Sequence, residues 1–268
     1  MSAFTITAVS DPAAPIARRN PLAKIAAALL PGLALLASVD PVAPAVVLAA
    51  TGACVPLCGI TWRSLARRAW PLALAVLTLT LGNAIFTGSK GGATVLEAGP
   101  LVLTTESLAV GGSAGLRVAA IALPGVLAIL TVDPVDLADA LVQRMRVSAR
   151  FAYGALAALR LAPLLAADWE TLGRARRARG LSAGANPVRA VRLFAGKVFA
   201  LLVGAVRRAS RLAAAMEARG FDSGRPRTAA REQRFDRGDV LLIAASVLVT
   251  ASAVGLSVVT GAWDPLLS

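Results

Sequence analysis

The stretch VLLIAASVLVTASAVGLSVVT, residues 240–260, contains no charged residue. An α-helix rises about 1.5 Å per residue, so about 20 apolar residues are needed to cross the hydrocarbon core of a bilayer, which is about 30 Å thick. This stretch has that length. The sequence therefore predicts a transmembrane helix over residues 240–260.

The composition of the whole chain is typical of a membrane protein. Of its 268 residues, 57% are hydrophobic and only 16% are charged, and the mean hydropathy is +0.70, values outside the range of ordinary soluble domains. Four further apolar runs have roughly spanning length, and only Asp40-Pro41 separates the first two, which predicts a tight turn. We therefore expect an all-α membrane protein with about five transmembrane helices. The four further runs are residues 25–39, 42–60, 70–86 and 108–131.

The basic residues are distributed unevenly along the chain. The net charge is +13, but aromatic residues make up only 4%, and a nucleic-acid surface would need more of them among the basic residues. If the N-terminus is cytoplasmic, all 28 Lys and Arg residues except Lys90 and Arg117 fall in cytoplasmic segments. Because Lys and Arg near the ends of spans favour the cytoplasmic side, the sequence predicts this orientation and no nucleic-acid partner. Residues 1–24 carry their charges directly before the first apolar run, the reverse of a signal peptide, and are expected to form a cytoplasmic tail.

Arg117 lies inside the fourth apolar run. A charge about 14 Å deep in a span is a candidate functional residue. An alternative is that its side chain snorkels toward the outer surface near Glu106. Both interpretations stay open.

The sequence divides into three parts. Residues 1–131 hold the tail and four expected transmembrane helices, and residues 240–268 hold the last transmembrane helix and the C-terminus. Residues 132–239 contain 20 basic and 10 acidic side chains and are expected to be cytoplasmic.

The middle part has two apolar stretches that resemble spans, residues 151–167 and 193–206. Arg160 interrupts the first and Lys197 the second, and either one crossing alone would place a cluster of arginines outside. The second stretch lies in a longer pattern with the three-to-four spacing of an amphipathic helix, which could lie on the membrane surface or pack on the bundle. Its apolar positions are Val191, Phe194, Val198, Leu202, Ala205, Ala209, Leu212 and Met216.

One heptad occurs twice: ARGLSAG at 178–184 and ARGFDSG at 218–224. In both copies a run of strong helix formers ends in Arg and then Gly, the composition of a helix C-terminus. We expect Gly180 and Gly220 at positive φ, just after a helix end. A single copy would be an ordinary stop to a helix, but two copies indicate two equivalent docking sites.

These paired motifs, Ala178-Arg179-Gly180 and Ala218-Arg219-Gly220, make the chain resemble the transmembrane T-component (EcfT/CbiQ-like) of energy-coupling factor transporters. Those transporters are ABC importers of vitamins and metal ions. NPLAK (20–24), TVDPVDLADAL (131–141) and the approach LRLAPLLAADWETLGRARRARG (159–180) resemble the same family. The resemblance covers nearly the whole chain.

The resemblance implies a bacterial plasma-membrane scaffold with long cytoplasmic coupling helices between its fourth and fifth spans. Each motif would seat in a groove of one of two ATPase subunits, and a separate small membrane subunit would bind the substrate, for example a vitamin or cobalt. ATP and Mg would be bound by the ATPases and no cofactor by this chain, which has no GxxxxGK loop followed by Ser or Thr. The substrate itself cannot be inferred from this chain.

Two other classes of function compete with a scaffold. A self-sufficient secondary permease would need polar groups at the bilayer midplane, where only Arg117 and Asn83 come close. A membrane enzyme would need a nucleophile, a metal cluster or an acid/base pair. Its best candidates, the acids of VDPVDLAD at 132–139, fit the first turn of a helix better. Cys54 and Cys58 have no His to complete a metal site and are expected to be ordinary buried thiols.

Overall fold

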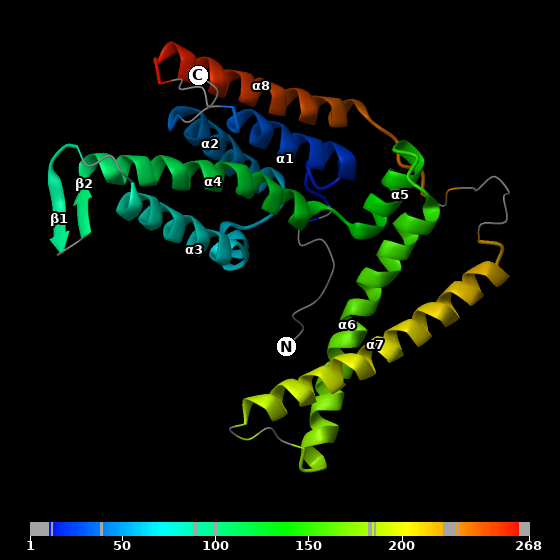
Figure 1. Cartoon of the computed structure of the whole chain (residues 1–268). Coiled ribbons are helices and arrows are strands. Elements are labelled where there is room, and N and C mark those ends of the chain that lie inside the picture. The colour runs from blue at the N-terminus through cyan, green and yellow to red at the C-terminus, as the bar shows by residue number, and fades with distance from the viewer. Residues whose placement is uncertain are drawn as a thin grey trace. The chain divides into compact units, whose positions relative to one another are not determined.

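The computed structural model describes most of the chain (Figure 1). Residues 8–140 together with 233–268 form a first unit, and residues 141–232 form most of a second. The described residues are 11, 13–37, 40–87, 91–98, 101–181, 184, 186–221, 229 and 231–262.

Five helices of the first unit are built on the five predicted apolar runs. They are α1 (Pro21–Leu35), α2 (Val42–Leu57), α3 (Trp62–Phe86), α4 (Thr105–Thr131) and α8 (Arg237–Val259). α4 packs against α1, α2 and α3, and α8 packs against α1 and α2 (Figure 1). The expected helical bundle is therefore confirmed, and the expected turn between α1 and α2 holds a buried Asp40 whose Oδ2 accepts from the N–H of Ala43 at 2.8 Å.

Four helices of the described chain are long and apolar enough to cross a membrane: α3, α4, α8 and α6 (Ala149–Ala178). α1 has 15 residues and α2 has 16, which is fewer than the roughly 20 that a perpendicular span requires. That these two helices cross the membrane stays a prediction. α6 contains residues 151–167, and the charge pattern predicts that these residues do not span the membrane. By its length and apolarity alone, α6 could nevertheless cross.

Small residues bring the bundle helices into close contact. Cβ atoms added at Gly111 and Gly115 of α4 would overlap atoms of Thr80 on α3, and this spacing of small residues is typical of tightly packed membrane helices. Elsewhere α3 exposes large apolar side chains, among them Trp70 at 62% and Phe86 at 87%. Lipid is the solvent that suits such a surface.

A short β-hairpin interrupts the otherwise helical chain. β1 (Thr94–Ala98) pairs antiparallel with β2 (Leu101–Thr104) between α3 and α4. These segments contain several β-branched residues, which favour strands, but each strand is too short and too weakly alternating to be predicted from sequence periodicity. The hairpin ends at Thr104, whose side chain accepts from the N–H of Ser107 at 3.2 Å and caps α4.

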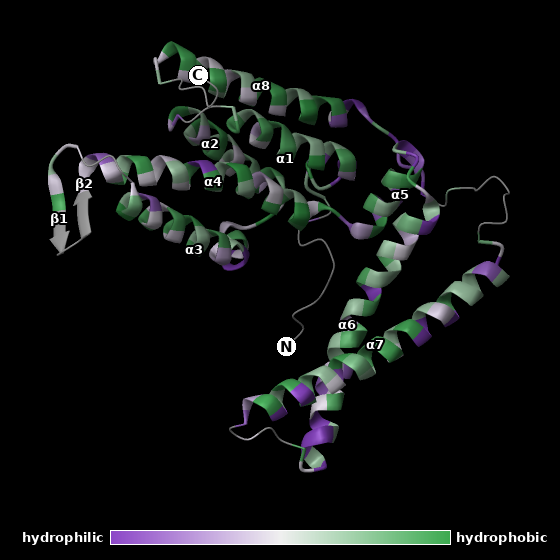
Figure 2. Cartoon of the chain, viewed as in Figure 1, coloured by the Kyte–Doolittle hydropathy of each residue, from purple (hydrophilic) through white to green (hydrophobic). Residues whose placement is uncertain are grey.

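The second unit is a pair of long helices, α6 and α7 (Pro187–Ala218), which cross each other (Figure 1). α5 (Pro134–Arg144) carries the chain from α4 toward them. Asp133 Oδ1 accepts from the N–H of Val135 at 2.7 Å at the start of α5, so these acids do begin a helix, as predicted. Figure 2 shows hydrophilic residues gathered at the end of α6 and at the start of α7.

Candidate functional site

α6 and α7 are held together where the C-terminal part of α6 meets the N-terminal part of α7. Lys197 Nζ lies 3.8 Å from the centroid of the Trp169 ring, and the same ring meets Phe194 edge to face at 5.4 Å between centroids. Arg176 Nη1 donates to the carbonyl oxygen of Leu193 at 2.5 Å. Cation–π and aromatic contacts of this kind each contribute about 0.5–1.5 kcal/mol. The hairpin is therefore antiparallel and has a fixed crossing point.

Next to Trp169 on α6, Asp168 forms an ion pair with Arg208, which lies further along α7. A Cβ at Gly173 would lie 3.2 Å from Lys197 Nζ, the end of a flexible side chain on α7. α7 has 32 residues and is therefore about 48 Å long. Because the helices are antiparallel, the C-terminal ends of α6 and α7 lie at opposite ends of the hairpin.

The first Ala-Arg-Gly motif forms the C-terminal cap of α6. Arg179 is the capping residue, at φ −88° and ψ 11°, and Gly180 follows at φ +71°. The N–H of Gly180 donates to the carbonyl of Arg177 at 2.9 Å, and the N–H of Leu181 donates to that of Arg176 at 3.0 Å. This pair of hydrogen bonds is the Schellman motif, which satisfies carbonyls that a helix end leaves free.

The second Ala-Arg-Gly motif forms the same cap on α7. Arg219 stands at φ −89° and ψ 9°, and Gly220 follows at φ +79°. The N–H of Gly220 donates to the carbonyl of Glu217 at 2.9 Å, and the N–H of Phe221 donates to that of Met216 at 3.0 Å. The predicted positive φ of both glycines is confirmed.

In both caps each residue of the motif has a distinct place. Ala178 and Ala218 are the last helical residues. Arg179 and Arg219 are exposed, and no hydrogen bond or ion pair within the described ranges occupies either guanidinium. A Cβ at Gly180 would meet nothing within 4 Å, so this position requires glycine for its backbone conformation and not for lack of space. The caps thus present two exposed guanidinium groups on rigid helix ends.

We call the end of α6 with Arg179 the first motif end. A cavity of about 660 Å³ adjoins it, between the end of α6 and the start of α7. Asn186 caps α7 there, because its Oδ1 accepts from the N–H groups of Val188 at 3.0 Å and Arg189 at 3.1 Å. The N-terminus of a helix adds partial positive charge to that of the side chains. Four arginines line the cavity: Arg176, Arg179, Arg189 and Arg192.

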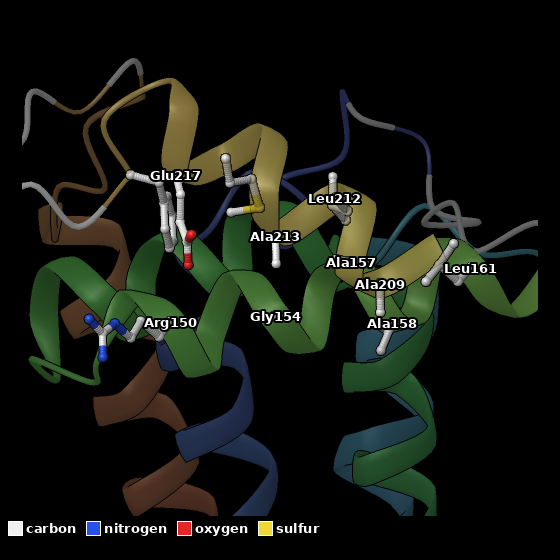
Figure 3. A pocket seen from close by; sticks show the side chains of 11 residues that line it. Arg150, Gly154, Ala157, Ala158, Leu161, Ala209, Leu212, Ala213 and Glu217 are labelled. Carbon is white, nitrogen blue, oxygen red and sulfur yellow. The ribbon is translucent and has the colours of Figure 1, made fainter. Parts of the chain in front are cut away.

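We call the end of α7 with Arg219 the second motif end. Beside it, a groove of about 650 Å³ separates the start of α6 from the end of α7 (Figure 3). Its lining is mostly glycine, alanine and larger apolar side chains, and Figure 3 shows Arg150 and Glu217 on facing helices at one end of it. The Tyr153 ring meets the Phe221 ring edge to face at 6.4 Å. This end is less basic than the first.

α7 has the predicted amphipathic pattern, and its apolar face is exposed. None of its residues is buried, and Val191 is 67% and Leu202 is 58% exposed. An apolar face on a basic helix suits a membrane surface or an apolar partner.

Arg117 belongs to the first unit, whereas both motifs belong to the second. It lies near the middle of α4 and is half-buried. The structure shows no ion pair between Arg117 and Glu106 among the described residues. A functional role for Arg117 stays a prediction. No group of His, Cys, Asp or Glu side chains within the described ranges gathers as metal ligands would.

Comparison with known proteins identifies the class of the chain. Its residues 13–230 match the family described as cobalt transport protein, CbiQ. The energy-coupling factor transporter transmembrane protein EcfT 1 of Listeria monocytogenes is 28% identical over 208 residues, covering 75% of this chain and 77% of that protein. EcfT of Streptococcus equi is 27% identical over 242 residues, 87% of this chain and 89% of its own length. EcfT of Exiguobacterium sibiricum is 30% identical over 186 residues, 65% of this chain and 70% of its own.

The apolar helices and these similarities define a transmembrane component of an energy-coupling factor transporter in the bacterial plasma membrane, a transport component and not itself an enzyme. The chain belongs to the CbiQ family.

Proposed function

We propose that the chain is the energy-coupling scaffold of an ATP-driven importer of a vitamin or a transition-metal ion. Two ATPase subunits dock on the two motif ends, and a separate small membrane subunit binds the substrate. ATP and Mg are bound by the ATPases, and this chain transmits their motion.

The observation that supports this proposal is the repetition of one cap at both ends of the hairpin. Arg179 and Arg219 extend from nearly identical backbones, and α7, about 48 Å long, separates the two ends. One small partner could not engage both arginines at that separation, which favours two partners. A guanidinium that reaches a carboxylate or carbonyl contributes about 1.5–3 kcal/mol.

The orientation follows from the basic residues. With a cytoplasmic N-terminus and α1, α2, α3, α4 and α8 as the spans, Arg179 and Arg219 reach the cytoplasm, where ATP is available. α6 has the length of a span, but Arg160 interrupts it, and crossing would carry its arginine-rich end to the outside. We therefore assign α6 and α7 to the cytoplasmic side, with the exposed apolar face of α7 toward lipid or a membrane subunit.

Cysteine labelling tests the orientation. In a variant with Cys54 and Cys58 replaced by Ala, Gly91→Cys should react with an impermeant thiol reagent in intact cells, while Val188→Cys should react only after the cells are opened. Val188 stands at the start of α7 and is 75% exposed, so burial would not explain a lack of reaction. Ser182, the position next to the first motif, lies outside the described residues. Labelling of Val188→Cys in intact cells would overturn the orientation.

Co-purification tests the scaffold role. The chain, expressed with the ATPase subunits of its own genome, should retain both of them. Arg179→Ala combined with Arg219→Ala should lose the ATPases and ATP-dependent uptake almost completely. Substrate capture by the binding subunit should persist, because that step does not use the motif ends. Arg207→Ala combined with Arg211→Ala removes two exposed arginines elsewhere on α7 and should retain the ATPases. Parental amounts of ATPase on the Arg179/Arg219 variant, or uptake by this chain alone, would contradict the proposal.

A further inference from the structure

A polar cluster is buried inside the first unit, at the start of α1. Lys24 is only 6% exposed. Its Nζ donates to the carbonyl of Ala17 at 2.7 Å and to that of Thr131, the last residue of α4, at 2.9 Å. The C-terminus of a helix carries partial negative charge, so an ammonium group is well placed against the end of α4.

Asn20, the residue that caps α1, also contacts the start of α8. The backbone N–H of Asn20 donates to Asp239 Oδ1 at 2.8 Å, while Asp239 Oδ2 accepts from the N–H of Asp236 at 2.8 Å. Asn20 and Asp239 are 5% and 3% exposed. On the surface of this cluster, Arg19 lies 3.6 Å from Asp236. One buried carboxylate thus caps α8 and fixes it to α1.

These contacts lie at the two places where the chain leaves and re-enters the first unit. Beyond Thr131 the chain passes through α5 and leaves the first unit after Ala140, and it returns at Gln233, shortly before Asp236 and Asp239. The segment Asn20–Lys24 therefore makes hydrogen bonds close to both places where the chain connects the first unit to the α6–α7 hairpin. None of these contacts involves a residue of the second unit.

A buried ammonium is a costly way to achieve packing alone. Removing a charge from water carries a penalty of several kcal/mol, which hydrogen bonds and nearby charges only offset. Asp133, Asp136 and Asp239 supply the negative charges around Lys24. An apolar side chain would fill the same space without a penalty, but it would not bind a carbonyl at the end of α4.

We propose that Lys24 and Asp239 are positioning residues for energy coupling. They fix the two connections to one point of the bundle, so that force on the hairpin moves the bundle instead of bending the connections. This inference rests on the proposed scaffold function. Without the cluster, the ATPases still bind and hydrolyse ATP, but less of their motion reaches the membrane helices.

The test compares uptake per ATP hydrolysed in proteoliposomes that contain the complete transporter. Lys24→Met keeps the length of the side chain and removes the charge, and we expect this ratio to fall about tenfold, with ATPase association unchanged. Lys24→Arg keeps the charge and the donors and should recover most of the ratio. Ser246→Ala is the matched control, because Ser246 Oγ also joins α8 to α1, donating to the carbonyl of Ala27 at 2.7 Å, but away from the connections. Its ratio should equal that of the parent.

Asp239→Asn provides a second measurement if Lys24→Met does not assemble, since it keeps an acceptor and removes the charge. It should lower the ratio in the same direction. An unchanged ratio in an assembled Lys24→Met or Asp239→Asn complex overturns the inference, as does an equal loss in Ser246→Ala. Failure of the scaffold function itself looks different, because the parent chain would then neither retain the ATPases nor support uptake.

Discussion

At the first motif end Arg179 is one of four arginines around a cavity, whereas at the second Arg219 follows a helix turn that contains Glu217, beside a groove lined mostly by apolar side chains. The backbones of the two caps are nearly the same. The cap is thus a local property of a few residues, while the charge around it depends on the helix that lies opposite. If two partners dock here as we propose, the difference predicts that their grooves share one anchor but differ in electrostatics: the first motif end favours an acidic groove, the second a more neutral one.

Replacing a single arginine should cause the largest loss of ATPase association at either motif end. Arg179→Ala and Arg219→Ala each remove one charge-assisted contact and should each weaken ATPase association by about 1.5–3 kcal/mol. Lys at either position should rescue only partly, because it lacks the planar fork of a guanidinium. Titration of purified ATPase onto the reconstituted chain measures the loss. If one single variant binds as tightly as the parent, the two ends are not equivalent anchors.

Glycine variants should affect both ends equally and somewhat less. Gly180→Val and Gly220→Val place a β-branched residue at positive φ, which strains the cap by more than about 1 kcal/mol and turns the preceding arginine away. Membrane insertion should be unchanged while ATPase association weakens. Gly204→Val, at a helical glycine of α7 outside both cavities where a Cβ would come no closer than 3.9 Å to the end of the Arg208 side chain, is the control for added bulk. Normal uptake by both cap variants would mean that the glycines do not aim the arginines.

Salt dependence should show the smallest effect and distinguish the two ends. The Arg219→Ala variant keeps only the first motif end, and the Arg179→Ala variant keeps only the second. Raising the salt concentration should weaken ATPase association more steeply in Arg219→Ala, because more exposed charges surround the first motif end. Glu217→Gln removes the acid of the second end and should change association only a few-fold, while Glu170→Gln, elsewhere on α6, should not change it. Equal salt slopes for the two single-arginine variants would mean that the surrounding arginines take no part in docking.

Several features were predictable because they depend on short segments. The five apolar runs correspond to five bundle helices, since burial in lipid or protein requires only a long enough run of apolar residues. Both caps and the start of α5 could each be predicted from two or three residues, because capping hydrogen bonds join residues that are close in the sequence. The β-hairpin was missed because Thr94–Ala98 and Leu101–Thr104 are too short for a clear period.

By itself, the sequence determined that this chain is a helical membrane protein with an arginine and a glycine at the ends of two long helices. Only the tertiary structure showed that Lys24 bonds to Thr131, 107 residues away, and Asn20 to Asp239, 219 residues away. It alone also showed that Arg189 and Arg192 border the cavity at Arg179 while Arg150 and Glu217 border the groove beside Phe221. The physical reason is that hydropathy and capping depend on residues close together in the sequence. A buried polar contact, or the electrostatic potential around a side chain, depends on which distant segments the packing of the helices brings together.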